Sequence, residues 1–160
     1  MEISVREIQE RDNISMEQII KRSLEEYGMA IEGTVYTDPV IRQLSKSYGG
    51  GRAAYFVVEI KGETVGGGGI APLSGADEDV CELQRMFVSG LHRGKGIGYG
   101  LLKHCIDFAQ KAGYKFCYLE SSEKLSDAIR LYERFGFKYL DDKMGDTGHF
   151  SCKTYMGMKI

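Results

Sequence analysis

The feature that most constrains the fold of this chain is a strand, a glycine-rich loop and a helix that follow one another. Residues 80–88, VCELQRMFV, have the composition and alternation of a β-strand, and apolar residues at helical spacing run from 98 to 113. Between them stands RGKGIG, at Arg93–Gly98. A helix that begins directly after such a loop presents unpaired backbone N–H groups, and these groups and the helix dipole favour a phosphate. The sequence therefore predicts an anion site at this loop.

Two other phosphate-binding motifs do not fit the same loop. A Walker loop needs G-x-x-x-x-G-K-[ST], whereas Ser89 stands at its first glycine and Gly96 at its final hydroxyl residue. A dinucleotide fingerprint needs G-x-G-x-x-G, and counting from Gly94 or Gly96 places Tyr99 or Leu101 at the last glycine. A nucleotide-binding domain of either kind is therefore not expected.

The rest of the chain alternates between strand and helix patterns. We expect helices at 14–31, 39–48, 98–113 and 126–135, the last capped by Ser126, and strands at 3–8, 53–60, 63–70, 80–88, 115–120, 137–140 and 149–160. This order predicts an α/β (α+β) fold, with a mixed central sheet of about seven strands and about four helices on its two faces. A length of 160 residues suits one domain, so residues 1–160 are expected to form a single unit.

Four successive glycines, Gly66–Gly69, lie in the second strand of a predicted hairpin whose turn is Lys61 and Gly62. Glycine weakens the interior of a strand, and it is tolerated where a bulge forms or where another backbone or a ligand comes close. The sequence leaves a bulge and a ligand contact as alternatives.

Composition narrows the choice of partners. The 21 basic and 23 acidic residues give a formal charge of −2, so we expect no nucleic-acid partner and no acidic membrane surface. The first residues, MEISVREIQERDN, carry charges where a secretory signal would be apolar, and the sequence has no run of about 18 apolar residues. We therefore expect a cytoplasmic protein, with small polar molecules as candidate substrates.

The cysteines predict neither disulfides nor a metal. Cys81, Cys105, Cys117 and Cys152 stand far apart without a C-x-x-C pair, and we interpret them as small apolar or incidental residues. His149 and Cys152 come nearest to a ligand pair, but a zinc site needs three or four ligands. No metal is expected.

The loop pattern [QR]-x-x-G-x-[GA], formed by Arg93, Gly96 and Gly98 after a strand, resembles the GNAT superfamily of N-acetyltransferases. Two segments carry the resemblance, ELQRMFVSGLHRGKGIGYGLL (82–102) and DAIRLYERFGF (127–137), and the predicted element order extends it over the whole chain. The resemblance implies acetyl-CoA as co-substrate, with the coenzyme's pyrophosphate held by Arg93, Gly94, Lys95, Gly96, Ile97, Gly98 and Tyr99. Positive charge beside the phosphates would come from the side chains of Arg93 and Lys95.

The resemblance also places Met86, Phe87 and Val88 beside the pantetheine arm, which would pair with the strand backbone. The N–H of Met86 would face the carbonyl oxygen of the acetyl group as that oxygen becomes negative, and losing one such donor elsewhere costs about 3 to 4 kcal/mol of barrier. Many members carry an Asn where this chain has Leu125, so a contact from that position to pantetheine is left open.

A protonated amine acceptor needs a base, since an alkylamine has a pKa of about 10. Glu82 lies four residues before Met86, so strand alternation would place both on one face, and histone-type members use a glutamate at the matching position. A structural or solvated role for Glu82 is the alternative, with Gln84 as a substrate ligand and His149 as a rival base. Tyr132 matches the tyrosine of the family's L-Y-x-x-x-G-F helix. The resemblance makes it the candidate acid for the coenzyme A thiolate and a contact of the coenzyme. The alternative is that Tyr132 is an ordinary core residue.

These residues predict an enzyme that moves an acetyl group from acetyl-CoA to a primary amine of a small-molecule acceptor, by direct transfer in a ternary complex. The alternative is a non-catalytic acyl-CoA-binding sensor or interaction module, and the presence of both Glu82 and Tyr132 argues against it. A homodimer is the oligomer most often formed by small enzymes and is the expected assembly.

Overall fold

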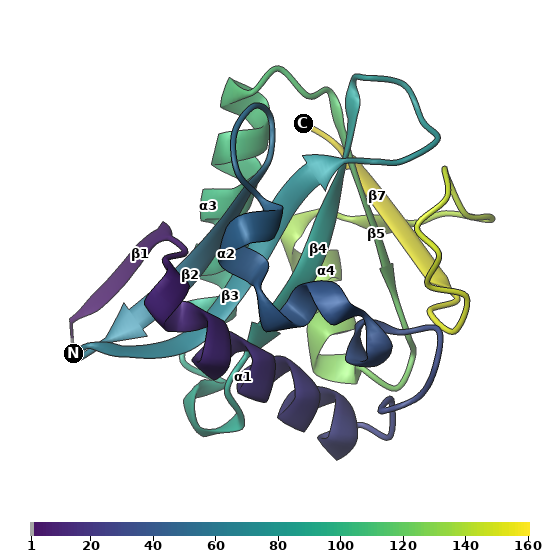
Figure 1. Cartoon of the computed structure of the whole chain (residues 1–160). Helices are drawn as coiled ribbons and strands as arrows, with labels where there is room; N and C mark the ends of the chain where they lie inside the picture. The colour runs from purple at the N-terminus through teal and green to yellow at the C-terminus, as the bar shows by residue number, and fades with distance from the viewer. Residues whose placement is uncertain (1) are drawn as a thin grey trace.

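A computed structural model describes residues 2–160, and a mixed β-sheet forms its centre (Figure 1). Over these residues the sheet has seven strands, in the order β1-β2-β3-β4-β5-β7-β6. The strands are β1 (Ile3–Glu7), β2 (Ala54–Ile60), β3 (Glu63–Pro72), β4 (Val80–Val88), β5 (Phe116–Ser121), β6 (Lys138–Tyr139) and β7 (Thr154–Lys159). Only β4 and β5 pair in parallel among the described strands; their other neighbours are antiparallel. The predicted fold class is confirmed.

Helices cover both faces of the sheet (Figure 1). They are α1 (Asn13–Glu26), α2 (Leu44–Ser47), α3 (Ile97–Lys111) and α4 (Ser126–Phe135). One apolar cluster joins α1 and α2 to one sheet face and includes Tyr55, and a second joins α3 and α4 to the opposite face and includes Leu101. Across residues 2–160 none of the helices has the length and apolar character needed to cross a membrane.

Several predicted element boundaries are wrong. The first helix ends at Glu26, five residues earlier than expected, because Gly28 adopts the left-handed region with φ of 70°. The second predicted helix divides into a 3-10 turn, Pro39–Arg42, and the short α2, because Gln43 leaves the helical region with φ of −140°.

The C-terminal elements also differ from the prediction. Ser126 is the first residue of α4 and not its cap, since Leu125 occupies the cap position and no side chain accepts a hydrogen bond there. The strand expected over 137–140 shrinks to the two residues of β6. The last strand begins at Thr154, because the segment before it forms turns instead of extending the sheet.

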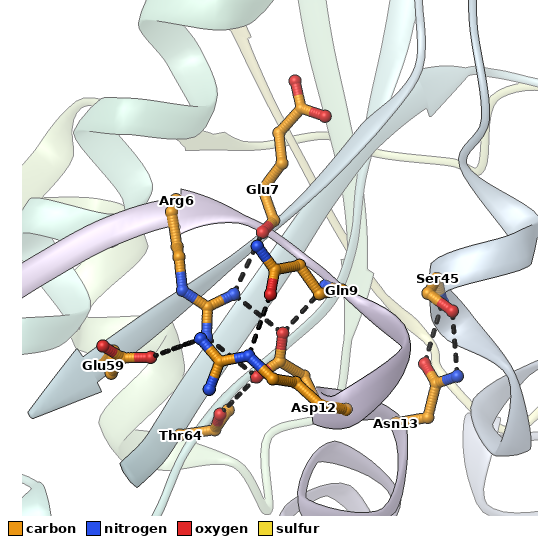
Figure 2. A network of polar contacts seen from close by, with 9 residues as sticks. Arg6, Glu7, Gln9, Asp12, Asn13, Ser45, Glu59 and Thr64 are labelled. Carbon is orange, nitrogen blue, oxygen red and sulfur yellow. Dashed lines mark hydrogen bonds and ion pairs between the residues drawn. The ribbon is translucent and has the colours of Figure 1, made fainter. Parts of the chain in front are cut away.

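A partly buried polar network joins β1 to the start of α1 (Figure 2). Arg6 donates to the Asp12 carboxylate at 2.8 Å, and the Thr64 hydroxyl donates to the same carboxylate at 2.7 Å. Burial alone would raise the pKa of Asp12, but these hydrogen bonds lower it to about 2. Asn13 exchanges two hydrogen bonds with Ser45, so the network extends from the sheet to α2.

The glycines of β3 make room for an aromatic ring. A Cβ on Gly67 would lie 2.6 Å from Cε1 of Tyr55, and a Cβ on Gly69 would lie 2.8 Å from Cδ2 of the same ring. Both approaches are too close for any side chain, so the ring of Tyr55, which belongs to β2, lies directly on β3. The close contact expected at Gly66–Gly69 is therefore made by a protein side chain.

A bulge accompanies these glycines, and its extra residue belongs to β4. Gly69 pairs with Gln84 and Gly67 with Phe87, so two steps along β3 match three along β4. Arg85, inside this step, has a left-handed φ of 50°. The bulge leaves Arg85 and Met86 without a registered partner in β3.

The bulge reverses the alternation of side chains along β4. Gln84 contacts Tyr48 beside α2, whereas Met86 packs with the cluster under α3. Glu82 hydrogen bonds to Gln84 and lies on the α2 side with it. The prediction that Glu82 and Met86 share one face is therefore wrong, because one inserted residue shifts the alternation by one position.

The sheet opens on the other side of β4. β4 and β5 pair only where Val80–Glu82 meets Phe116–Tyr118, although both strands continue beyond these residues. After Glu82 the two strands are no longer hydrogen bonded to each other, and the edge of β4 that carries Met86 faces a gap in the sheet.

Candidate functional site

A cavity of about 780 Å³ lies where β4 and β5 separate. Its walls come from α1, β4, the glycine loop, β5, α4 and the segment before β7. The residues predicted from the sequence that line it are Glu82, Gln84, Met86, Phe87, Val88, Arg93, Gly94, Gly96, Gly98, Tyr99, Leu125, Tyr132 and His149. Two others do not line it: Ile97 is buried at the start of α3, and the side chain of Lys95 is exposed on the loop.

The glycine loop has the backbone conformation that its sequence requires. Gly94 and Gly96 have φ of 76° and 79°, and no atom of residues 2–160 lies within 4 Å of a Cβ built on either, so these glycines serve conformation and leave open space. Gly96 is the N-cap of α3, and among the described residues no side chain caps the helix, so the N–H groups of its first turn have no side-chain acceptor there. A Cβ on Gly98 would lie 3.1 Å from Leu131, so this glycine lets α3 and α4 approach each other.

Arg93 fastens the loop to its surroundings. Its Nε donates to the carbonyl of Val88 at 3.1 Å, and its two terminal nitrogens donate to Glu26 at 2.7 Å and to Ser23 at 3.0 Å. The positive charge of Arg93 is thus balanced by Glu26. Of the two cations expected beside the phosphates, Lys95 alone makes no ion pair within residues 2–160.

Two further arginines of α4, Arg130 and Arg134, line the same end of the cavity and were missed by the sequence analysis. Arg130 forms an ion pair with Asp127, and the guanidinium of Arg134 lies 5.6 Å from the centre of the Tyr99 ring. Their spacing of four residues places both on one face of a helix, and this was the available signal.

Glu82 is buried at the end of the paired part of β4, with 7% of its surface exposed. Burial raises its pKa to about 7, and the charge of Glu120 adds to this rise, while a 2.7 Å hydrogen bond from the amide of Gln84 opposes it. A carboxyl group with a pKa near neutrality can accept a proton at the pH of a cell.

A polar cluster that the sequence analysis did not find surrounds this carboxyl group. Arg85 donates to Asp38 at 2.6 Å and to the hydroxyl of Tyr48 at 2.6 Å. Nε2 of His149 lies 3.6 Å from the same Asp38 carboxylate. Asp38 and Arg85 are 47 residues apart and meet through the left-handed backbone of Arg85, so no local pattern could reveal the pair.

Tyr132 projects from α4 and is largely buried, with its ring 5.9 Å from the ring of Phe137. Burial raises the pKa of its hydroxyl, which therefore stays protonated and can donate a hydrogen bond. Among residues 2–160 this hydroxyl has no hydrogen-bonding partner, although Tyr132 lines the cavity. Its donor is available to a molecule in the cavity.

The cysteines are free thiols in the described part of the chain, and Cys81, Cys105 and Cys117 are buried in the core. Cys152 lines the cavity, and burial raises its pKa to about 11. Within residues 2–160, no group of three or more His, Cys, Asp or Glu side chains could hold a metal ion.

Comparison with known proteins identifies relatives of this chain. Residues 16–137 match the family described as acetyltransferase (GNAT) family. An uncharacterized N-acetyltransferase of Escherichia coli (strain K12), YjgM, is 42% identical over 147 residues, which cover 91% of this chain and 88% of that protein.

Solved structures share the fold over nearly the full length. A GNAT-family acetyltransferase from Staphylococcus aureus Mu50 has a TM-score of 0.83 at 20% identity and covers 99% of both chains. The PaiA N-acetyltransferase from Thermoplasma acidophilum, solved in complex with coenzyme A, has a TM-score of 0.79 at 19% identity and covers 100% of both chains.

Proposed function

This chain belongs to the acetyltransferase (GNAT) family and is an acetyl-CoA-dependent N-acetyltransferase, and from this premise we propose that it acetylates a primary amine of a small acceptor. In this proposal both substrates occupy the cavity together, and transfer is direct. The observation that carries it is one continuous cavity, lined both by the uncapped N-terminus of α3 and by the buried carboxyl group of Glu82.

The coenzyme half of the cavity suits a long phosphorylated molecule. We assign the pyrophosphate to the backbone N–H groups of Arg93–Tyr99, because positive φ angles at two glycines turn the loop towards an anion and the helix dipole favours it. The exposed Lys95 would add charge, and Arg93 would hold the loop in place. The pantetheine arm would lie along the backbone of Met86–Val88, at the unpaired edge of β4.

The reacting groups meet in the same cavity. The carboxylate of Glu82, directly or through water, would take a proton from the amine as its nitrogen bonds to the thioester carbon. The N–H of Met86 would donate to the carbonyl oxygen while that oxygen is negative. The carbon–sulfur bond would then break, and the hydroxyl of Tyr132 would give its proton to the departing thiolate and recover one from solvent.

The acceptor half of the cavity supports a small polar acceptor. Glu82, Gln84, Arg85 and His149 line it, and Arg85 is held by Asp38 inside the cavity wall. A recessed polar pocket of this kind suits a small amine better than a protein chain. A single domain over residues 1–160 is part of the proposal and is supported by the continuous sheet. Cytoplasmic location and a homodimer stay predictions.

Release of free thiol from acetyl-CoA tests this function directly. The protein is incubated with acetyl-CoA and, in turn, with amino acids, polyamines, aminoglycosides and short peptides, and thiol is measured against a sample without acceptor. We expect one class of small amine to raise thiol release well above that background. Binding of acetyl-CoA without thiol release for any amine would support an acyl-CoA sensor instead.

A further inference from the structure

One buried side chain outside the cavity contacts the bulge of β4. Tyr55 is 1% exposed and its hydroxyl donates to the carbonyl oxygen of Arg85 at 2.7 Å. Burial raises the pKa of this hydroxyl well above its ordinary value, so it remains a donor at any working pH. The contact joins β2 to β4 across the strand between them.

The glycines of β3 are what allow this contact. β2 and β4 are separated by two interstrand spacings, about 10 Å, so the ring of Tyr55 must lie flat over β3 to reach β4. Gly67 and Gly69 provide the space, since a Cβ on either would lie within 2.8 Å of the ring. Tyr48 packs on Tyr55 with 5.2 Å between ring centres, so the phenol has little freedom to move.

The carbonyl that Tyr55 holds belongs to the same peptide group as the N–H of Met86. A trans peptide is planar and its C=O and N–H point in opposite directions, and no described peptide bond is cis. Tyr55 holds the carbonyl on the β3 side of β4, so the N–H of Met86 is directed to the other side, where β4 faces the cavity.

This peptide needs an external contact to keep its orientation. The bulge leaves Arg85 and Met86 without a registered partner in β3, and Arg85 occupies the left-handed region that a non-glycine residue disfavours. A ladder hydrogen bond, which orients peptides elsewhere in the sheet, is replaced here by the phenol of Tyr55.

We propose that Tyr55 is a positioning residue for acetyl transfer, and that Gly67 and Gly69 are glycines so that its hydroxyl can aim the N–H of Met86 at the thioester carbonyl. The inference rests on the proposed function, because it assumes that the acetyl group of acetyl-CoA lies at Met86. It assigns a catalytic reason to two glycines of the run, Gly67 and Gly69, which the coenzyme and acceptor sites do not explain.

Infrared spectroscopy of the bound thioester tests this without an acceptor. Acetyl-CoA labelled with ¹³C at the carbonyl is bound to wild-type protein and to Tyr55→Phe, and the carbonyl frequency is compared with that in water. We expect a lower frequency on wild-type protein, because a hydrogen bond from Met86 polarises the carbonyl, and a smaller shift on Tyr55→Phe. The rate of thiol release with the most active amine of the panel should fall about tenfold, with the Kd for acetyl-CoA unchanged.

Tyr114→Phe is the matched control. Tyr114 is 2% exposed and its hydroxyl donates to the carbonyl of Arg52 at 2.8 Å, but it does not line the cavity. Loss of the Tyr114 hydroxyl should lower Tm about as much as loss of the Tyr55 hydroxyl. It should leave the carbonyl frequency of the bound thioester and the rate of thiol release unchanged.

Three results would overturn the inference. If Tyr55→Phe keeps the wild-type frequency and rate, Tyr55 does not position the N–H, and the proposed function survives. If both Phe variants lose rate equally, the effect is one of general stability. If the wild-type protein itself shows no shift, the role of Met86 in the proposed function fails together with the inference.

Discussion

The guanidinium of Arg93 donates to the carboxylate of Glu26 at 2.7 Å, and this ion pair fastens the glycine loop to α1. The sequence pattern assigns Arg93 to the phosphates because an arginine opens the [QR]-x-x-G-x-[GA] motif. The structure supports a different use of this side chain, in which its three hydrogen bonds keep the loop in the shape that presents backbone N–H groups.

Replacement of Arg93 by Lys separates charge from shape. Lysine keeps the positive charge but cannot make the three directed hydrogen bonds of the guanidinium. We expect the Kd for coenzyme A, measured by calorimetry, to rise about tenfold.

Glu26→Gln is the complementary variant, because glutamine keeps an acceptor for Arg93 and removes a negative charge near the anion site. It should bind coenzyme A slightly more tightly at low salt and equally at high salt. If Arg93→Lys bound coenzyme A with wild-type affinity, the three hydrogen bonds of Arg93 would not be needed to hold the loop.

The pH profile of transfer tests Glu82 as the base. Because its pKa is raised to about 7, we expect kcat to rise with pH through a step near that value as the carboxyl group ionises. Glu82→Gln should lose the step and about 100-fold or more in kcat. If the step persists in this variant and disappears in His149→Asn, the rival base is correct.

The same carboxyl group should make the protein less stable as pH rises. Its pKa is about 7 folded against 4.5 as the ordinary value, so between these values the folded state binds more protons than the unfolded state. The free energy of unfolding should therefore fall with rising pH over this window, by about 3 kcal/mol in total. Glu82→Gln should remove this fall and be the more stable protein at pH 8, as urea denaturation at pH 5 and pH 8 would show. An equal pH dependence in both proteins would argue against the raised pKa.

Removal of the Tyr132 hydroxyl tests the acid. Tyr132→Phe keeps the ring that packs on Phe137 and removes the donor that faces the cavity. We expect kcat to fall at least tenfold while the Kd for acetyl-CoA changes less than twofold. Tyr139→Phe is the control, since Tyr139 is exposed on β6 and its hydroxyl donates to Glu133, away from the cavity lining. Unchanged turnover in Tyr132→Phe would remove this residue from the mechanism.

The two kinds of glycine should respond oppositely to alanine. Gly67→Ala places a methyl group 2.6 Å from the ring of Tyr55, and overpacking of this kind costs about 2 kcal/mol of stability. Beyond its own helix backbone and chain neighbours, the methyl group of Gly100→Ala meets no atom of the described residues within 4 Å on the exposed side of α3. This change should stabilise the protein by about 0.5 kcal/mol, because alanine favours a helix. Thermal unfolding of both variants would test this; a tolerated Gly67→Ala would contradict the packing of Tyr55 on β3.

The sequence was sufficient where the signal is local. The strand, loop and helix around Arg93–Gly98 are contiguous, and the glycines there have the backbone angles that their positions require. Alternation predicted the two strands of the hairpin, and helical spacing predicted the helix that carries Tyr132. These features need only neighbouring residues to be determined.

Features that depend on distant residues could not be predicted. The bulge at Arg85 contacts the ring of Tyr55, which is 30 residues earlier in the chain, and strand alternation alone misplaces Met86 relative to Glu82. The pair of Asp38 and Arg85 forms across 47 residues. The pairing of Arg93 with α1 likewise depends on a helix that stands 67 positions earlier.

The inserted residue of β4 divides the strand into two parts with separate tasks. Before it, Glu82 and Gln84 project towards the α2 face; after it, Met86 and Val88 project beneath α3. Under the proposed function, mutations in the first part can alter which amine is recognised without disturbing the packing that shapes the second. Related proteins could therefore change their acceptor and lose little affinity for coenzyme A, because β4 would tolerate the substitutions that such a change requires.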